Sequence, residues 1–255
     1  MPTQQICRIV EAVKLNDFAH SFVLEVGDMV PGTGQFLHIN CGHSRLLRRP
    51  ISICDWQEGE PDNLIRIVFE VRGEGTEWLS RRKLGDKLDV LGPLGRGFET
   101  AQTGRYLLVG GGIGVPPLLG CAHNAMGNCT AILGFRDAAH ALLLDDFQKA
   151  CRNVVVTTDD GSLGRHGFVD AAVIDTLEKE KDFTAIFACG PKPMLKSVVK
   201  AAAQYGVPCK VSLEERMACG VGACLGCAVQ MADGTMKHVC KDGPVFLAGE
   251  VDWDA

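Results

Sequence analysis

The chain has 255 residues, a formal net charge of −5 at pH 7 and a sequence pI near 5.8. Charged residues make up 22% and hydrophobic residues 46% of it, as in ordinary globular proteins, and the acidic balance excludes a nucleic-acid binder that works by charge. No run of 18 apolar residues is present, and the start MPTQQICRIVEAV lacks the basic and apolar regions of a signal peptide. We therefore expect a cytoplasmic protein without a nucleic-acid or membrane partner.

The first 100 residues consist mostly of short strand-like segments. In chain order these are CRIVEAVKL, SFVLEV, QFLHINC, PISICDW, LIRIVFEV and KLDVLGPLG, separated by turns that contain glycine, proline or aspartate. Many short strands with little helix favour an antiparallel barrel or sandwich. The one helix candidate in this block is TEWLSRRK at 76–83.

Strand and helix patterns alternate in the second block, residues 101–213. Its apolar strands are RYLLVGGG, CTAILGF, NVVVTTDDG, TAIFACG and CKVSLE, and helix-like runs lie between them at 115–126, 143–151, 168–180 and 191–205. This alternation predicts a parallel sheet with crossover helices. From residue 214 the periodic structure gives way to a cysteine-rich loop and a short tail. We therefore expect three domains, at 1–100, 101–213 and 214–255.

Four of the twelve cysteines are clustered in the third block. The other eight are scattered singly, and in a reducing cytoplasm we interpret them as free thiols. The clustered four have the spacing C-x4-C-x2-C-x12-C, which is typical of plant-type [2Fe–2S] sites, whereas a zinc ribbon prefers two C-x2-C pairs. The sequence therefore favours a [2Fe–2S] cluster, with a four-cysteine zinc site and a disulfide pair as alternatives; the expected ligands are Cys219, Cys224, Cys227 and Cys240.

Two segments of the first block carry groups that suit an anionic pyrophosphate. RRPISI (48–53) places an arginine and a serine on either side of a proline-led strand, and RGEGTEWL (72–79) places a tight glycine turn before a helix start. A cation, a hydroxyl and a helix N-terminus together favour a phosphate ligand. Taken singly, Arg49 can be an ordinary surface charge and Thr76 an ordinary helix N-cap.

The second block opens with a glycine-rich turn between a strand and a helix. LLVGGGIGVPPLLG (107–120) supplies Gly110, Gly111, Gly112 and Gly114, which would let a dinucleotide phosphate approach the backbone. The G-x-G-x-x-G fingerprint is not satisfied, because its third glycine is absent and no acidic residue ends the next strand. The turn alone therefore leaves a nucleotide site open.

Further candidate residues follow other strands of this block. TTDDG (157–161) and ACGPKPML (188–195) each end a strand at the carboxyl edge, where ligands bind in such sheets. Asp159 can equally be a turn residue, and Cys189 a buried thiol. Arg136 can accept the 2′-phosphate of NADP, or it can be a solvated charge.

The order of these motifs resembles the ferredoxin–NADP reductase superfamily, in which an Arg-Pro-x-Ser strand and a later Gly-x-Gly-Thr turn hold a flavin. The resemblance implies an antiparallel β-barrel that binds FAD, followed by a parallel α/β domain that binds NAD and a small C-terminal [2Fe–2S] domain. It assigns FAD to Arg49, Pro50, Ile51, Ser52, Val68, Phe69, Glu70, Gly75 and Thr76. It assigns the nicotinamide nucleotide to Gly110, Gly111, Gly112, Gly114, Asp159 and the turn Cys189, Gly190 and Pro191.

The complete order, with the flavin block first and the cluster last, is similar to that of the electron-transfer subunits of class B dihydroorotate dehydrogenase. The stretches that match are GGGIGVPPLL, TTDDGS, ERMACGVGACLGC and CKDGPVF. The resemblance implies a separate FMN-containing catalytic subunit, an α2β2 heterotetramer, and electron flow from FMN through the cluster and FAD to NAD+. It implies no acid–base catalytic residue in this chain, with Ser52 and Cys189 near the flavin and nicotinamide.

Two other functions stay open on the sequence. One is a related FAD and [2Fe–2S] reductase subunit that serves a hydrogenase, a sulfite reductase or a ferredoxin-linked transhydrogenase. The other is a redox-sensing or zinc-stabilised binding module without turnover. The absorption spectrum of a flavin with an iron–sulfur cluster would exclude the binding module. Co-purification with an FMN subunit would distinguish a dihydroorotate dehydrogenase subunit from the related reductase subunits.

Overall fold

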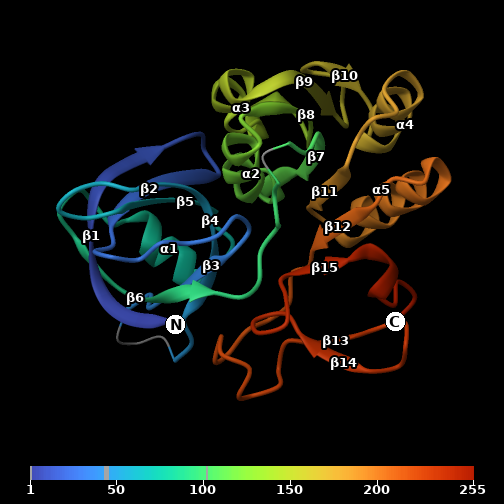
Figure 1. The fold of residues 1–255 in the computed structure, drawn as a ribbon. Helices are drawn as coiled ribbons and strands as arrows, with labels where there is room; N and C mark the ends of the chain where they lie inside the picture. Colours follow the sequence, from blue (N-terminus) through green and yellow to red (C-terminus); the bar gives the residue numbers. More distant parts are fainter. Residues whose placement is uncertain (1, 43–45, 102) are drawn as a thin grey trace.

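The computed structural model of the protein describes residues 2–42, 46–101 and 103–255. Its first part is a closed antiparallel barrel with the strand order β1-β2-β5-β4-β3-β6 (Figure 1). The predicted barrel is therefore confirmed. Its elements are β1 (Thr3–Lys14), β2 (Ala19–Glu25), β3 (Phe36–Ile39), β4 (Arg49–Gln57), β5 (Leu64–Glu70), helix α1 (Glu74–Ser80) and β6 (Lys87–Leu94).

Alternating side chains fill the barrel. In β6, Leu88 and Val90 are buried while Lys87 is exposed, which is the period of two expected when one face of a strand packs inward. These two residues join Phe22 and Ile67, among others, in a core enclosed by the strands. The inward-facing side chains of this alternation form the inner surface of the barrel.

The second part is a sheet with the order β10-β9-β8-β7-β11-β12-β15. Its neighbouring strands are parallel except for the pair β12 and β15, so the predicted parallel α/β domain is confirmed. The strands are β7 (Tyr106–Gly111), β8 (Gly127–Phe135), β9 (Cys151–Thr158), β10 (Arg165–His166), β11 (Ala185–Cys189) and β12 (Cys209–Ser212).

Helices cover both faces of this sheet, with α2 and α3 on one side and α4 and α5 on the other (Figure 1). The helix expected at 115–126 begins as short 3₁₀ turns, since Pro116 and Pro117 lack the N–H groups that an α-helix uses. The bounds are η1 (Gly112–Gly114), η2 (Pro116–Leu118), α2 (Leu119–Asn124), η3 (Ala138–His140), α3 (Leu144–Ala150), α4 (Val169–Lys179) and α5 (Lys192–Tyr205).

The C-terminal segment contacts both of the other parts. Its strand β15 (Val245–Leu247) pairs antiparallel with β12 at the edge of the sheet, and the backbone N–H of Arg96, just after β6, donates to the carbonyl of Gly243. Its remaining elements are β13 (Ala228–Gln230), β14 (Met236–His238) and η4 (Ala248–Glu250). The cysteine loop is thereby held against the barrel and the sheet together. Across the described residues, no helix has the length and apolar composition needed to cross a membrane.

Candidate redox site

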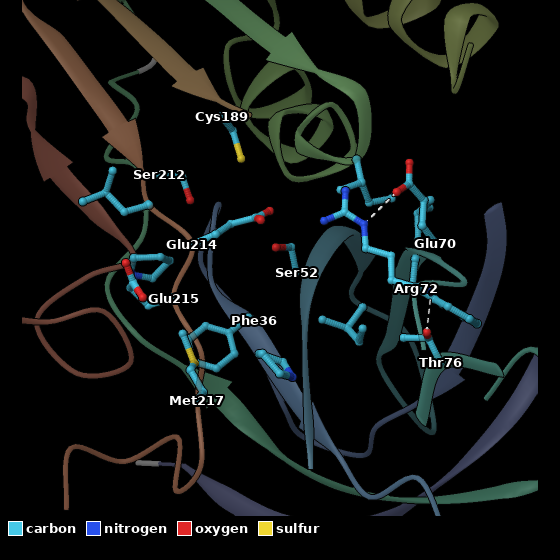
Figure 2. Close-up of a pocket in the computed structure, with 17 residues that line it drawn as sticks. Phe36, Ser52, Glu70, Arg72, Thr76, Cys189, Ser212, Glu214, Glu215 and Met217 are labelled. Atoms are coloured by element: carbon cyan, nitrogen blue, oxygen red, sulfur yellow. Dashed lines mark hydrogen bonds and ion pairs between the residues drawn. The ribbon is translucent and has the colours of Figure 1, made fainter. Parts of the chain in front are cut away.

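A cavity of about 210 Å³ lies between the barrel and the sheet (Figure 2). Strands β3, β4 and β5 supply one wall, and the ends of β11 and β12 supply the opposite wall. Residues predicted separately for the flavin and the nicotinamide meet in this one cavity, which we call the flavin cavity. They are Pro50, Ile51, Ser52, Val68, Phe69, Glu70, Thr76 and Cys189.

Arg49 and Gly75 are brought together at the edge of the barrel, although neither lines the cavity. A Cβ added to Gly75 would lie 2.6 Å from Nε of Arg49, so only glycine lets the arginine side chain lie across this turn. The guanidinium also donates from Nη1 to the carbonyl of Leu47 at 2.7 Å. The pair therefore forms a fixed cation beside the first turn of α1, which fits the phosphate role predicted for Arg49.

Thr76 is engaged within its own turn. Its Oγ1 accepts hydrogen bonds from the backbone N–H groups of Arg72 and Gly73, at 2.9 and 3.2 Å (Figure 2). Arg72 was missed by the sequence interpretation, and its Nε donates to Oε2 of Glu70 at 2.9 Å. Arg72 directly precedes the glycine turn. Its charge at the start of RGEGT is therefore the sequence signal that could have identified it as a site residue. The pyrophosphate role of Thr76 stays a prediction.

The ends of β11 and β12 carry polar groups into the same cavity. Cys189 is buried, and burial together with the Glu214 carboxylate raises the pKa of its thiol to about 12, with Ser212 opposing the rise. The thiol is therefore protonated at neutral pH. Figure 2 shows the Glu214 side chain reaching toward Ser52 on the facing strand. Ser212 and Glu214 were missed, although the carboxyl-edge rule could have found both at the end of β12.

A second cavity, of about 490 Å³, lies at the carboxyl ends of β7, β8 and β9, and we call it the nucleotide cavity. Four residues predicted for the nucleotide line it: Gly111, Gly112, Asp159 and Pro191. Arg136 also lines it, together with Asp170 and Phe168, which the sequence interpretation missed. Phe168 is 69% exposed, so it offers an uncovered aromatic ring to a ligand. Gly190 instead lines a neighbouring cavity of about 400 Å³, which shares Pro191.

The predicted glycines of the nucleotide turn have different roles. Gly112 has a φ of +53°, and a Cβ there would meet no atom within 4 Å, so the backbone is open to a phosphate. In contrast, a Cβ on Gly114 would lie 2.4 Å from the carbonyl oxygen of Cys189, and one on Gly110 would lie 2.8 Å from Cγ2 of Val115. Gly110 and Gly114 therefore serve the packing of the turn against β11 and η2.

The four clustered thiols lie in a loop whose backbone amides point at sulfur. Sγ of Cys219 accepts from the N–H groups of Val221, Ala223 and Cys224 at 3.3–3.4 Å, and Sγ of Cys240 accepts from Gly222 at 3.1 Å. Burial would raise the pKa of Cys219, but these amides outweigh it and lower the pKa to about 6. Because iron takes thiolates, a loop that stabilises a thiolate fits a cluster.

The four thiols interact with one another. Cys219 interacts with Cys224, and Cys240 interacts with both Cys227 and Cys219. Within the described ranges, no three His, Cys, Asp or Glu side chains gather closely enough to hold a single metal ion. The four cysteines would supply the thiolates that a [2Fe–2S] cluster takes. Cys224 is exposed, whereas Cys227 and Cys240 are buried, so one edge of the site faces outward.

Comparisons with known proteins place this arrangement in a family. The iron–sulfur cluster binding domain of dihydroorotate dehydrogenase B matches residues 214–252, and an oxidoreductase NAD-binding domain matches residues 108–200. The electron transfer subunit of dihydroorotate dehydrogenase B (NAD(+)) from Caldanaerobacter subterraneus subsp. tengcongensis is 41% identical over 248 residues, 96% of each chain. The chain belongs to this family of electron transfer subunits. A subunit of the same name from Fusobacterium nucleatum subsp. nucleatum is 44% identical over 86% of each chain.

Solved structures of similar fold agree with this family. The structure of an NADH-dependent reduced ferredoxin–NADP oxidoreductase, described for flavin-based electron bifurcation, has a TM-score of 0.86 and 35% identity. The matched region covers 98% of this chain and 91% of the chain in that structure. A ferredoxin reductase of carbazole 1,9a-dioxygenase has a TM-score of 0.68 at 26% identity, over 81% and 67% of the two chains. The predicted cofactor set of FAD, an iron–sulfur cluster and NAD is thereby confirmed for a dihydroorotate dehydrogenase B electron transfer subunit.

Proposed function

We propose that this chain carries electrons from the FMN of a separate dihydroorotate dehydrogenase subunit through a [2Fe–2S] cluster and FAD to NAD+. The observation that supports this most strongly is the continuity of the three sites. Glu215 and Met217, just before the first cluster cysteine, line the same cavity as Ser52 and Cys189. Two residues beyond Cys189, Pro191 lines the nucleotide cavity. The flavin cavity therefore adjoins the cluster loop on one side and the nucleotide cavity on the other.

The residues of the flavin cavity would hold and orient the reacting groups. Bound FAD would supply the conversion between single electrons and a hydride, which a one-electron cluster and NAD+ both require. Arg49 would bind the flavin phosphate as a fixed cation. The neutral Cys189 thiol would form an uncharged wall beside the nicotinamide. The Glu214 carboxylate would orient the Ser52 hydroxyl that it approaches across the cavity.

NADH is expected to reduce the flavin of this protein better than NADPH. Asp159 and Asp170 outnumber Arg136 in the nucleotide cavity, so the charge of a 2′-phosphate is disfavoured there. We expect kcat/KM for dye reduction to be at least about tenfold higher with NADH, which corresponds to about 1.4 kcal/mol. A preference for NADPH that disappears in Arg136→Ala would instead assign the 2′-phosphate to this arginine.

The cluster edge is the surface we assign to the FMN subunit. Cys224 is exposed there, and the next residue, Leu225, is 61% exposed, with Val221 also exposed. Apolar side chains around a redox centre suit a partner that must approach it closely. We infer that two copies of this chain join two catalytic subunits, as an α2β2 heterotetramer.

Leu225→Asp is expected to abolish co-purification with the FMN subunit without loss of FAD or cluster absorbance. Met126→Asp on the nucleotide domain is the matched control, because Met126 is also highly exposed, at 76%, and also has a positive φ. Native mass measurement of the wild-type complex should give two copies of each chain. Capture of a ferredoxin-linked partner in place of the FMN subunit would favour a related reductase instead.

A further inference from the structure

His38 is a buried polar residue in the wall of the barrel. It lies on β3, is 0% exposed, and pairs in register with Pro50 on β4. Neither ring nitrogen makes a hydrogen bond of normal geometry. In the part of the chain that the structure describes, no other buried side-chain nitrogen or oxygen lacks a partner in this way. A buried N–H without an acceptor is costly, so this histidine needs a physical explanation.

The ring of His38 lies directly against the cluster loop. A Cβ added to Gly220 would be 2.6 Å from Nδ1 and 3.2 Å from Cε1, so the ring is packed on the glycine that follows Cys219. Gly220 has a φ of +74°, a conformation that strains other residues. Both this backbone conformation and the small space beside the ring therefore require glycine at this position. The barrel and the cysteine loop are therefore in direct contact here, with the His38 ring against the loop backbone.

Two backbone carbonyls lie near the ring. They belong to Arg48 and to Cys219, and both interact with His38. A neutral imidazole has one N–H donor and one bare nitrogen, so one of these carbonyls can serve as its acceptor. Because Nδ1 is the nitrogen nearest Gly220, the carbonyl of the preceding residue, Cys219, is the acceptor that an Nδ1–H can reach in the loop.

We propose that His38 is a positioning residue for the cluster: its Nδ1–H donates to the carbonyl of Cys219 and fixes the loop against β3. This inference rests on the proposed role of the cysteine loop. A small shift of the loop toward the ring would complete the bond and remove the unsatisfied donor. Residues that contact a metal ligand without binding the metal themselves set both the orientation and the electronic properties of that ligand.

The same strand also sets the separation between the cluster loop and the flavin cavity. Phe36 lies two residues before His38 on β3, and it lines the flavin cavity. Residues two apart on a strand share a face and lie about 7 Å apart. Since electron transfer slows steeply with distance, a rigid strand that contacts both sites would keep their spacing constant. His38 is the point at which this spacing is fixed on the cluster side.

Three substitutions test the hydrogen bond separately from packing. His38→Leu removes both nitrogens, His38→Asn keeps an amide nitrogen close to the place of Nδ1, and His38→Gln moves the amide toward the place of Nε2. The readouts are the electron paramagnetic resonance spectrum and midpoint potential of the cluster, and the rate at which NADH reduces it. FAD content and NADH-dependent dye reduction, which bypass the cluster, report whether the barrel is intact.

We expect His38→Leu and His38→Gln to change the spectrum and the potential of the cluster and to slow its reduction by about tenfold, at the lower end of what such losses cost. His38→Asn should restore both properties, with dye reduction unchanged in all three. Equal behaviour of His38→Asn and His38→Gln would overturn the proposal, even if His38→Leu failed to fold. A wild-type protein that holds no cluster after reconstitution would overturn the proposed function as well, whereas wild-type properties in all variants would overturn this inference alone.

Discussion

Cys224→Ala is expected to lose the visible absorbance and the iron of the cluster while it keeps FAD and NADH-dependent dye reduction. Cys224 interacts with Cys219 at the exposed edge of the loop, and its loss would remove one of the four thiolates that a [2Fe–2S] cluster takes. The flavin cavity does not include Cys224, so the barrel and the sheet should still bind their ligands. Iron and sulfide analysis, with the flavin absorbance of the same sample, measures both outcomes.

The matched control for this variant is Cys209→Ala. Cys209 begins β12 and is buried in the core of the sheet, and its sulfur donates a weak hydrogen bond to the carbonyl of Lys210, at 4.0 Å. Its removal should leave the iron content unchanged. Full iron content in Cys224→Ala would show that the ligand set Cys219, Cys224, Cys227 and Cys240 is wrong.

Arg49→Ala is expected to weaken FAD binding by about 10- to 100-fold. A charge-assisted hydrogen bond to phosphate contributes about 1.5–3 kcal/mol, and every 1.4 kcal/mol changes affinity tenfold. Gly75→Ala should have a similar effect, because its Cβ would push the Arg49 side chain out of place. Flavin retained after dialysis, measured at several FAD concentrations, gives the change in affinity.

The control for Arg49 is Arg81→Ala. Arg81 follows α1, is largely exposed, and forms an ion pair with Glu77, one helical turn away. We expect this variant to hold FAD like the wild-type protein. If Arg49→Ala also kept its flavin, Arg49 would be an ordinary surface charge and the phosphate would be held by other groups.

The sequence predicted features that depend on spacing along the chain. The thiols 219, 224 and 227 are close in sequence, and the loop between them has little freedom, so C-x4-C-x2-C determines much of its own geometry. The alternation of Leu88 and Val90 with polar neighbours likewise specifies one buried face of a strand. Such local patterns were sufficient for the barrel, the parallel sheet and the cysteine loop.

Features that depend on contacts between distant segments were missed. Glu214 reaches the flavin cavity only because β12 ends opposite β4, and no local pattern records that juxtaposition. His38 resembles any polar residue in a strand until the cluster loop is packed on it. The strand β15 is three residues long, too short for periodicity to reveal, and it is specified by its pairing with β12.

The most direct test of the proposed electron path is the formation of NADH from dihydroorotate and NAD+ by the reconstituted complex. The proposed path predicts NADH formation only when this chain is mixed with the FMN-containing catalytic subunit. It also predicts that Cys224→Ala stops this reaction while NADH-dependent dye reduction continues. Undiminished NADH formation by the Cys224→Ala complex with no cluster present would contradict the path, because electrons would then reach NAD+ without passing through the cysteine loop.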